Sequence, residues 1–297
     1  MPPPLIAVIG PVETHLLHAW VDHYRALGVR DFHLALHLPE HAPQGSEQRL
    51  RETLDRLGVT PVLVEHGAWH ETTNANLRDR LRAHADAEWH LIADSDEFHT
   101  FATSLDDTVT AAKTAGHTVV RGLMLDRVTR TGHLNGWRPP EAETTGEGPR
   151  ARLDAAYPLG GLLTHRLLLA DPRKIVLARS GVTVSSGNHR APGHHPAHGP
   201  VAVVHHFKWR HGTDADLRRR IDRFASGAWT ETSPAVRHEA ARLLEHLRQN
   251  GGRIDTADPV LRFRPVTLDH TPPGWQDEAH RILTRWRPTH TETNPER

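Results

Sequence analysis

The sequence predicts an α/β fold in which helices cover both faces of a mostly parallel central sheet. In the first 125 residues, short apolar runs alternate with stretches in which apolar residues recur at helical spacing. The first such unit joins the run Leu5–Ile9 to a helical stretch that ends at Gly28, and similar units follow it. Repeated strand–helix units of this length favour parallel strands. With 297 residues and 37% hydrophobic content, the chain can bury a core in one large domain or two small ones.

The elements of the N-terminal half follow from apolar runs, alternation and turn residues. Phe32, Leu34, Leu36 and Leu38 alternate as in a strand, and Gly58 closes the helical stretch that comes next. Strands are expected at residues 5–9, 32–38, 61–64, 89–93 and 119–125, and helices at 16–27, 50–57, around 77–81 and around 109–112.

The pattern is less regular after Asp126. Residues 132–160 are rich in Gly, Pro, Glu and Thr, which predicts a long loop, and loops of this length in compact domains are usually functional. Strands are expected at 162–169, 175–178, 182–185 and 201–204, and helices near 214–225 and 234–249, the second ended by Gly251-Gly252. The tail from Pro288 is polar and is expected to be frayed.

Composition excludes several classes of function. The 36 Lys and Arg residues balance 36 Asp and Glu residues, so the chain lacks the cationic field used for non-specific binding to nucleic acid or anionic lipid. The absence of cysteine excludes disulfides, zinc–thiolate sites and a cysteine nucleophile. No signal peptide is recognisable and no apolar stretch is long enough to cross a membrane, so we expect a cytoplasmic protein without an integral membrane segment.

The feature that best indicates chemistry is the acidic run Asp94-Ser95-Asp96-Glu97-Phe98, directly after the apolar strand 89–93. Ligands of open parallel sheets bind beyond the carboxyl ends of the strands. Two aspartates one residue apart at such a place can hold a hard divalent cation, Mg²⁺ or Mn²⁺, whose coordination phosphate oxygens and water complete. An acidic loop that caps the next helix is the alternative interpretation.

Histidines and basic residues gather further along the chain. Seven histidines fall within residues 189–211, and His205 and His206 end the predicted strand 201–204. One of these two could be a metal ligand or a phosphate donor, but adjacent strand residues face opposite sides, so only one can point into a given site. Lys208 and Arg210 are candidate diphosphate ligands, whereas the arginines of 218–223, flanked by aspartates, favour a solvated, salt-bridged helix face.

These residues together resemble bacterial family 2-like glycosyltransferases of the GT-A fold. The resemblance spans roughly residues 5–225 and is carried by Glu13, Trp20, Val21, His23, Tyr24, Leu27 and Gly28, the acidic run 94–98, Asp126-Arg127, Tyr157-Pro158-Leu159-Gly160, Lys174, Gly187-x-His189 and His206-Phe207. Two departures stand out: the family's His-Tyr dipeptide appears here as His206-Phe207, and its usual Asn before the glutamate is Val12.

The resemblance implies transfer of a sugar from a nucleotide-sugar donor to an acceptor, most simply with inversion. Asp94, Asp96 and His206 would hold Mn²⁺ or Mg²⁺ on the departing diphosphate, with Glu13, His189, Lys208 and Arg210 on the donor side. Asp126, or failing that Glu97, would take the proton of the acceptor hydroxyl. The implied catalytic domain covers 1–225, with a donor-binding half to about 126 and an acceptor-side half beyond it; 226–297 would be a C-terminal helical extension and polar tail.

Two other classes of function also fit acidic metal ligands next to basic residues. One is nucleotidyl or phosphoryl transfer, although the sequence has no glycine-rich phosphate loop. The other is a non-catalytic module that binds nucleotide-sugars. The acceptor has no readable signature, so a saccharide, a lipid-linked compound and a small molecule all stay open.

Overall fold

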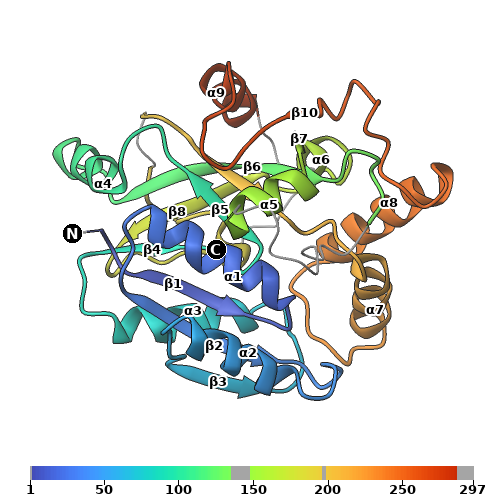
Figure 1. Ribbon diagram of the computed structural model, residues 1–297, viewed down its shortest axis with the longest axis horizontal. Helices are drawn as coiled ribbons and strands as arrows, with labels where there is room; N and C mark the ends of the chain where they lie inside the picture. Colours follow the sequence, from blue (N-terminus) through green and yellow to red (C-terminus); the bar gives the residue numbers. More distant parts are fainter. Residues whose placement is uncertain (1, 135–147, 196–198, 286–297) are drawn as a thin grey trace, which may run out of the picture.

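A ten-stranded mixed sheet runs through the part of the chain that the computed structural model describes, residues 2–134, 148–195 and 199–285 (Figure 1). The strand order is β10-β7-β6-β8-β4-β1-β2-β3, and β9 pairs with β5 and β6. The strands are β1 (Leu5–Ile9), β2 (Phe32–Leu38), β3 (Leu63–His66), β4 (Trp89–Ile92), β5 (Glu97–Thr100), β6 (Val119–Val128), β7 (Leu159–Gly161), β8 (Arg173–Arg179), β9 (Ala202–His206) and β10 (Arg264–Pro265).

The N-terminal half confirms the predicted α/β class. β1 is parallel to β2 and β4, and β2 is parallel to β3. All five residues of β1 and all four of β4 are buried, which explains why these strands appear in the sequence as continuous apolar runs. The strand predicted at 61–64 lies two residues later, at β3.

Helices cover both faces of this parallel half. They are α1 (Thr14–Ala26), α2 (Ser46–Arg56), α3 (Thr73–His84) and α4 (Leu105–Thr114). Leu5, Ala7 and Ile9 pack with apolar residues of α1 and α2, whereas Ile6 and Val8 pack with Leu77 and Leu81 of α3 on the opposite face. α1 ends where Gly28 adopts a φ of 89°, a conformation that costs glycine little.

The second half of the sheet is largely antiparallel. β8 lies antiparallel between β4 and β6, β7 is antiparallel to β6, and β9 is parallel to β6 but antiparallel to β5. Four further helices follow along the chain: α5 (Pro149–Ala156), α6 (Leu163–Arg166), α7 (Thr213–Ala225) and α8 (Ala235–Gln249), and a 3₁₀ turn, η1, spans Ser186–Asn188. The predicted strands 175–178 and 201–204 and both predicted helices are therefore confirmed.

Several predictions in this half were wrong because distant partners decide the local structure. Residues 162–169 contain α6, whose Thr164 backbone N–H donates to Asp126 Oδ2 at 2.6 Å. Residues 182–185 form no strand, since buried Arg78 and Arg82 bind their carbonyl groups. β5 was missed, and so were α5 and β7 at the end of the predicted loop 132–160; its residues 135–147, like the tail from 288, lie outside the described residues.

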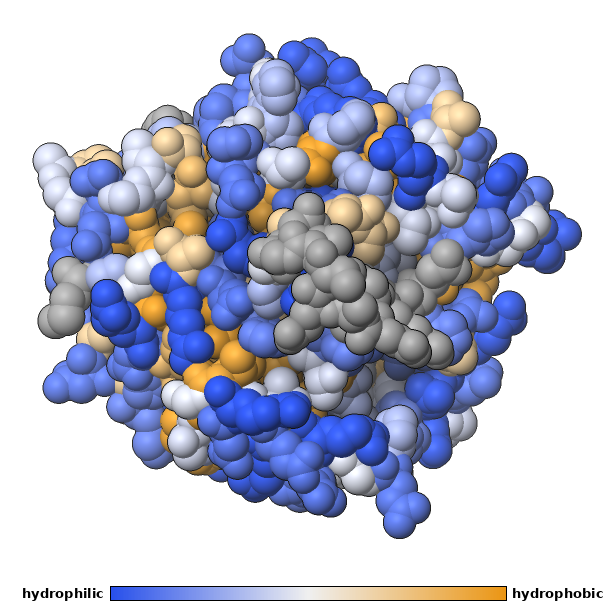
Figure 2. Space-filling model, viewed as in Figure 1, coloured by the Kyte–Doolittle hydropathy of each residue, from blue (hydrophilic) through white to orange (hydrophobic). Residues whose placement is uncertain are grey.

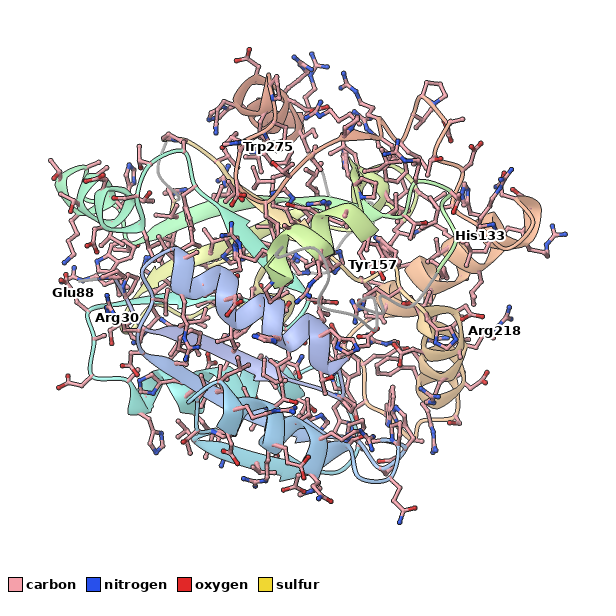
Figure 3. The ribbon with its side chains drawn as sticks, viewed as in Figure 1. Arg30, Glu88, His133, Tyr157, Arg218 and Trp275 are labelled. Atoms are coloured by element: carbon pink, nitrogen blue, oxygen red, sulfur yellow. The ribbon has the colours of Figure 1, made fainter. Side chains whose placement is uncertain are left out.

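The segment after residue 225 packs onto the sheet and its helices. α8 packs against α7, β10 pairs with β7, and α9 (Trp275–Arg285) places Trp275 against Leu123 and Val203. Figure 3 shows Trp275 at the start of α9 and Tyr157 at the end of α5. Most of the face seen in Figure 2 is hydrophilic, with apolar residues in small areas between. Within the described ranges, no helix is long and apolar enough to cross a membrane.

Gly122 of β6 provides a test of the packing between β8 and β9. A Cβ atom at this position would lie 2.6 Å from Val204 Cγ2 and 2.7 Å from Val176 Cγ1. We expect Gly122→Ala to lower the free energy of unfolding in urea by about 1–3 kcal/mol, because the valines must move. Gly10→Ala, where a methyl group would meet nothing within 4 Å, is the control. Equal free energies of unfolding of the two variants would show that Val176 of β8 and Val204 of β9 can move aside at no cost.

Candidate functional site

A cavity of about 1680 Å³ lies beyond the carboxyl ends of the parallel strands. Its walls come from the chain after β1, β2 and β4, from β8 and η1, from the end of β9, and from α7 and α8. All the predicted site residues line it except Asp126.

Two aromatic side chains of α1 hold the backbone of the acidic turn that follows β4. Trp20 Nε1 donates to the backbone oxygens of Asp94 and Glu97, at 3.1 and 3.0 Å, and the Tyr24 hydroxyl donates to the same Glu97 oxygen at 2.9 Å. Both aromatic side chains are fully buried. The backbone of the turn is therefore held by the core, while Asp94, Ser95, Asp96 and Glu97 line the cavity.

Lys174, at the start of β8, binds two acidic side chains at once. Its Nζ lies 3.0 Å from Asp94 Oδ2 and 2.6 Å from Glu97 Oε1, and it donates to the Gly187 carbonyl at 2.7 Å. Burial alone would lower the pKa of Lys174, but the two carboxylates raise it overall. Burial alone would raise the pKa of Glu97, but Lys174 holds it well below its ordinary value. Glu97 and Lys174 thus form a buried ion pair with Asp94 as third member.

The other oxygen of Asp94 is bound by a residue that the sequence did not suggest. Asn188 Nδ2 donates to Asp94 Oδ1 at 3.2 Å, and Arg78 donates to the Asn188 amide oxygen at 2.7 Å. Asn188 has a φ of 59°, a conformation that asparagine tolerates better than most residues. Burial raises the pKa of Asp94; Lys174 opposes this, while Glu97 and Asp96 add to it. Nothing in the sequence around Asn188 points to a partner 94 residues away.

Asp126 and His206 form a second polar network. His206 Nδ1 lies 3.0 Å from Asp126 Oδ1, and the same oxygen accepts from Trp209 Nε1 and Thr164 Oγ1, both at 2.8 Å. Asp126 is fully buried, with 0% exposure. Because a carboxylate oxygen accepts, Nδ1 of His206 is the donor in this contact, which leaves Nε2 for other partners. This Nε2 lies 3.9 Å from Asp96 Oδ2 at the cavity wall.

His205 lies on the opposite side of β9. It is completely buried, and Arg127 donates to its Nδ1 at 3.2 Å. Burial and the Arg127 charge lower the pKa of His205 well below its ordinary value. Of the two adjacent histidines, His206 therefore is the one that lines the cavity.

The basic residues after β9 differ in how they are bound. Arg210 makes a two-oxygen ion pair with Glu13, with Nε at 3.1 and 3.2 Å from the carboxylate, while its second terminal nitrogen is buried without a hydrogen bond. The Lys208 ammonium lies 5.3 Å from the centre of the Trp209 ring. This ammonium has no hydrogen bond or ion pair with a described residue. Arg218 points outward from α7, at the edge of the molecule in Figure 3. Arg219 and Arg220 pair with Asp216 as predicted, but they line the cavity.

His189 lies beside Lys174 at the same wall. Its Nδ1 donates to the Arg173 carbonyl at 2.8 Å, and its ring lies where a Cβ on Gly187 would be. Burial, with the charge of Lys174, lowers the pKa of His189 to about 4. The imidazole is therefore neutral at pH 7, and its Nε2 is an acceptor.

The donor set of the cavity suits a cation only in combination with a ligand. Within the described part of the chain, no three His, Asp or Glu side chains are grouped to hold a metal ion. Asp96, 23% exposed, and His206 Nε2 present two suitable donor atoms close together. The Asp94 oxygens already accept hydrogen bonds from Lys174 and Asn188, so Asp94 is less available.

No family model matches the sequence, and no curated protein matches it significantly. Among solved structures, S. aureus TarS 1–349 in complex with UDP-GlcNAc is 13% identical, with a TM-score of 0.38 over 84% of this chain and 75% of that one. The mannosyltransferase PcManGT from Pyrobaculum calidifontis, in complex with GDP-Man and Mn²⁺, is 14% identical, with a TM-score of 0.35 over 85% and 74%. The chain spans 45% of another S. aureus TarS structure. At these TM-scores, functional conclusions have to come from the site itself.

The Lys174 network can be tested through stability. Lys174→Met would leave the buried Glu97 carboxylate without its cation, and we expect a loss of about 3–5 kcal/mol in the free energy of unfolding. Adding Glu97→Gln should restore part of this loss, because the uncompensated charge disappears. Lys113→Met, which breaks an exposed ion pair with Glu88, is the matched control and should cost less than about 1 kcal/mol. Urea unfolding of the wild type and the three variants measures these differences; no recovery in the double variant would contradict the charge argument.

Proposed function

We propose that the protein is a nucleotide-sugar-dependent glycosyltransferase with a GT-A-like architecture. The observation that carries this proposal is the Asp96–His206–Asp126 chain, which presents a carboxylate and an imidazole nitrogen to the cavity. Both lie beyond the carboxyl ends of strands, next to the cationic side chains of Lys208 and Arg210. Asp96 and His206 offer two ligand atoms to a divalent cation, and Lys208 and Arg210 add positive charge beside them. Together these groups suit the binding of a diphosphate ester.

Asp96 and His206 are the residues that would hold Mn²⁺ or Mg²⁺, with diphosphate oxygens and water as further ligands. A bound cation of this kind would neutralise charge on the leaving diphosphate. The geometry supports His206 because Asp126 fixes its tautomer, an arrangement common among metal-binding histidines. Asp94 would act beside them, oriented by Lys174 and Asn188, with its remaining lone pairs toward the ligand.

The remaining donor-side residues fall into two kinds. Lys208 and the buried unpaired nitrogen of Arg210 are free to donate to phosphate oxygens. Glu13 holds the Arg210 guanidinium in place, and neutral His189 offers an acceptor nitrogen to a donor hydroxyl. In this proposal Glu13 therefore positions Arg210.

For Asp126 and Glu97, the geometry favours support over the predicted proton transfer. Both Asp126 oxygens accept hydrogen bonds, and the residue does not line the cavity. Glu97 is paired with Lys174 and is also buried. We infer that Asp126 positions His206 and that Glu97 positions Lys174. Because α8 lines the cavity, the proposed catalytic unit also extends beyond the predicted limit at 225.

Calorimetry with UDP, GDP, CDP and dTDP tests the proposal directly. At least one nucleoside diphosphate should bind. EDTA in place of Mn²⁺ should weaken the affinity for this nucleotide at least about tenfold, because Asp96 and His206 need a cation between them and the diphosphate. Asp96→Ala and His206→Ala should each cause a similar loss in Mn²⁺. Replacing His205 by Ala serves as the control on the opposite face of β9.

Three outcomes would change the assignment. Equal affinity with and without Mn²⁺ would remove the cation from the site. A loss confined to the His205 variant would reverse the roles of the two histidines. Nucleotide binding without any turnover of nucleotide-sugars would favour the non-catalytic binding module.

Asp126→Asn distinguishes a positioning role from that of a base. The Asn amide would place a donor among the Thr164 and Trp209 donors and would disturb the His206 tautomer, so we expect Mn²⁺-dependent nucleotide affinity to fall about 10–100-fold. A base acting on the acceptor would lower kcat and leave this affinity intact. Calorimetry and turnover of the same variant decide between the two.

A further inference from the structure

Glu239 of α8 differs from the other acidic side chains of the cavity. Eight acidic residues line it, and seven have a hydrogen bond or ion pair with a described residue: Glu13, Glu71, Asp94, Asp96, Glu97, Asp171 and Asp216. The Glu239 carboxylate has no hydrogen bond or ion pair with any residue in the described part of the chain. It is partly buried, and burial raises its pKa, against the opposing charges of Lys208, Arg242 and Arg220. A carboxylate in this condition is available to a ligand.

The position of Glu239 relates it to the proposed donor site. Asp96, Lys208 and Glu239 all line the cavity, and Lys208 is near enough to both carboxylates to feel their charges. A ligand diphosphate held by Asp96, His206 and Lys208 would therefore lie in the same cavity as the Glu239 carboxylate. This carboxylate is open to a second substrate that enters the cavity.

Apolar residues form part of the cavity wall on the side of Glu239, next to the charged Lys208, Arg220 and Arg242. Leu168, Leu169 and Ala170, which follow α6, and Pro234, Ala235 and Val236 at the start of α8 all line the cavity. Arg242 of α8 donates to the Leu168 carbonyl at 2.6 Å, so the two segments are tied together. Leu169 is 41% exposed and has a φ of 54°, a left-handed conformation that is unfavourable for leucine. The fold thus holds an exposed leucine in a strained conformation at the cavity.

Resting on the proposed glycosyltransferase function, we propose that Glu239 is the catalytic base, in an acceptor site formed by α8 and residues 168–170 that takes an alcohol with an apolar group. The acceptor O–H proton moves to the Glu239 carboxylate, and the oxygen forms a bond to the anomeric carbon. The bond between that carbon and the diphosphate oxygen breaks, and its electron pair leaves with the diphosphate.

Water can serve as the acceptor probe. The substrate is a nucleotide-sugar of the nucleoside diphosphate that binds in calorimetry. The rate of its hydrolysis, measured with Mn²⁺ as release of nucleoside diphosphate, should fall at least about 100-fold in Glu239→Gln. Nucleotide affinity should stay within about twofold of wild type, which also shows that the variant is folded. Glu245→Gln is the matched control, because Glu245 lies on the same helix, is exposed and pairs with Arg248; it should behave as wild type.

Azide separates a base from a structural residue. Azide attacks the anomeric carbon without losing a proton, so formation of the glycosyl azide should proceed in Glu239→Gln at close to the wild-type rate. Parallel loss of the water and azide reactions would make Glu239 structural, and undiminished reaction with water would exclude it as the base. If wild-type protein binds no nucleoside diphosphate, the proposed function fails, whatever Glu239 does.

Simple alcohols test the apolar wall. With 1-butanol and methanol at equal concentration, alkyl glycoside should form at least about tenfold faster from butanol, since each buried methylene is worth about fourfold. Leu169→Asn, which suits the left-handed conformation but removes the apolar group, should narrow this ratio. Equal use of both alcohols by the wild-type protein would overturn the assignment of an apolar acceptor.

Discussion

The ammonium group of Lys174 is the interaction on which the arrangement of this cavity depends. Without it, Asp94 and Glu97 would meet near the bottom of the cavity, where burial and mutual repulsion disfavour two charged carboxylates. Because the same nitrogen also donates to Gly187, it fixes the 3₁₀ turn that carries Asn188. One cation therefore determines the relative positions of the acidic turn, of β8 and of the turn that follows β8.

A second network, around Asp126, orients His206, as Lys174 orients Asp94 and Glu97. Asp126 receives hydrogen bonds from β9, from Trp209 and from the first turn of α6, so Asp126 is held from three directions and in turn orients His206. The two networks meet where Asp96 and His206 approach within 3.9 Å. Fixing donors before the ligand arrives avoids reorganisation during the reaction. The cost of burying these charges is offset by the ion pairs and hydrogen bonds between them.

The sequence predicted the parallel half of the fold because those strands are buried on both faces and so appear as apolar runs, as in β1 and β4. It failed where partners are remote. Residues 182–185 looked like a strand, yet Arg78 and Arg82, about 100 positions away, bind their carbonyl groups. The acidic run and His206 were recognisable from residue type and position. Asn188, Thr164 and Glu239 were not, because their importance comes only from what the fold brings next to them.

The change from parallel to antiparallel pairing explains how these residues reach one edge of the sheet. β8 runs antiparallel to β4, so Lys174 at its start lies near the end of β4, where Asp94 follows. β9 runs parallel to β6 with Asp126 paired to His206, so both end at the same edge. Residues placed by strands are rigid, whereas Lys208 and Glu239 come from a loop and a helix and have no described polar partner. The residues on strands are therefore preorganised, whereas Lys208 is free for the proposed diphosphate and Glu239 for a second substrate.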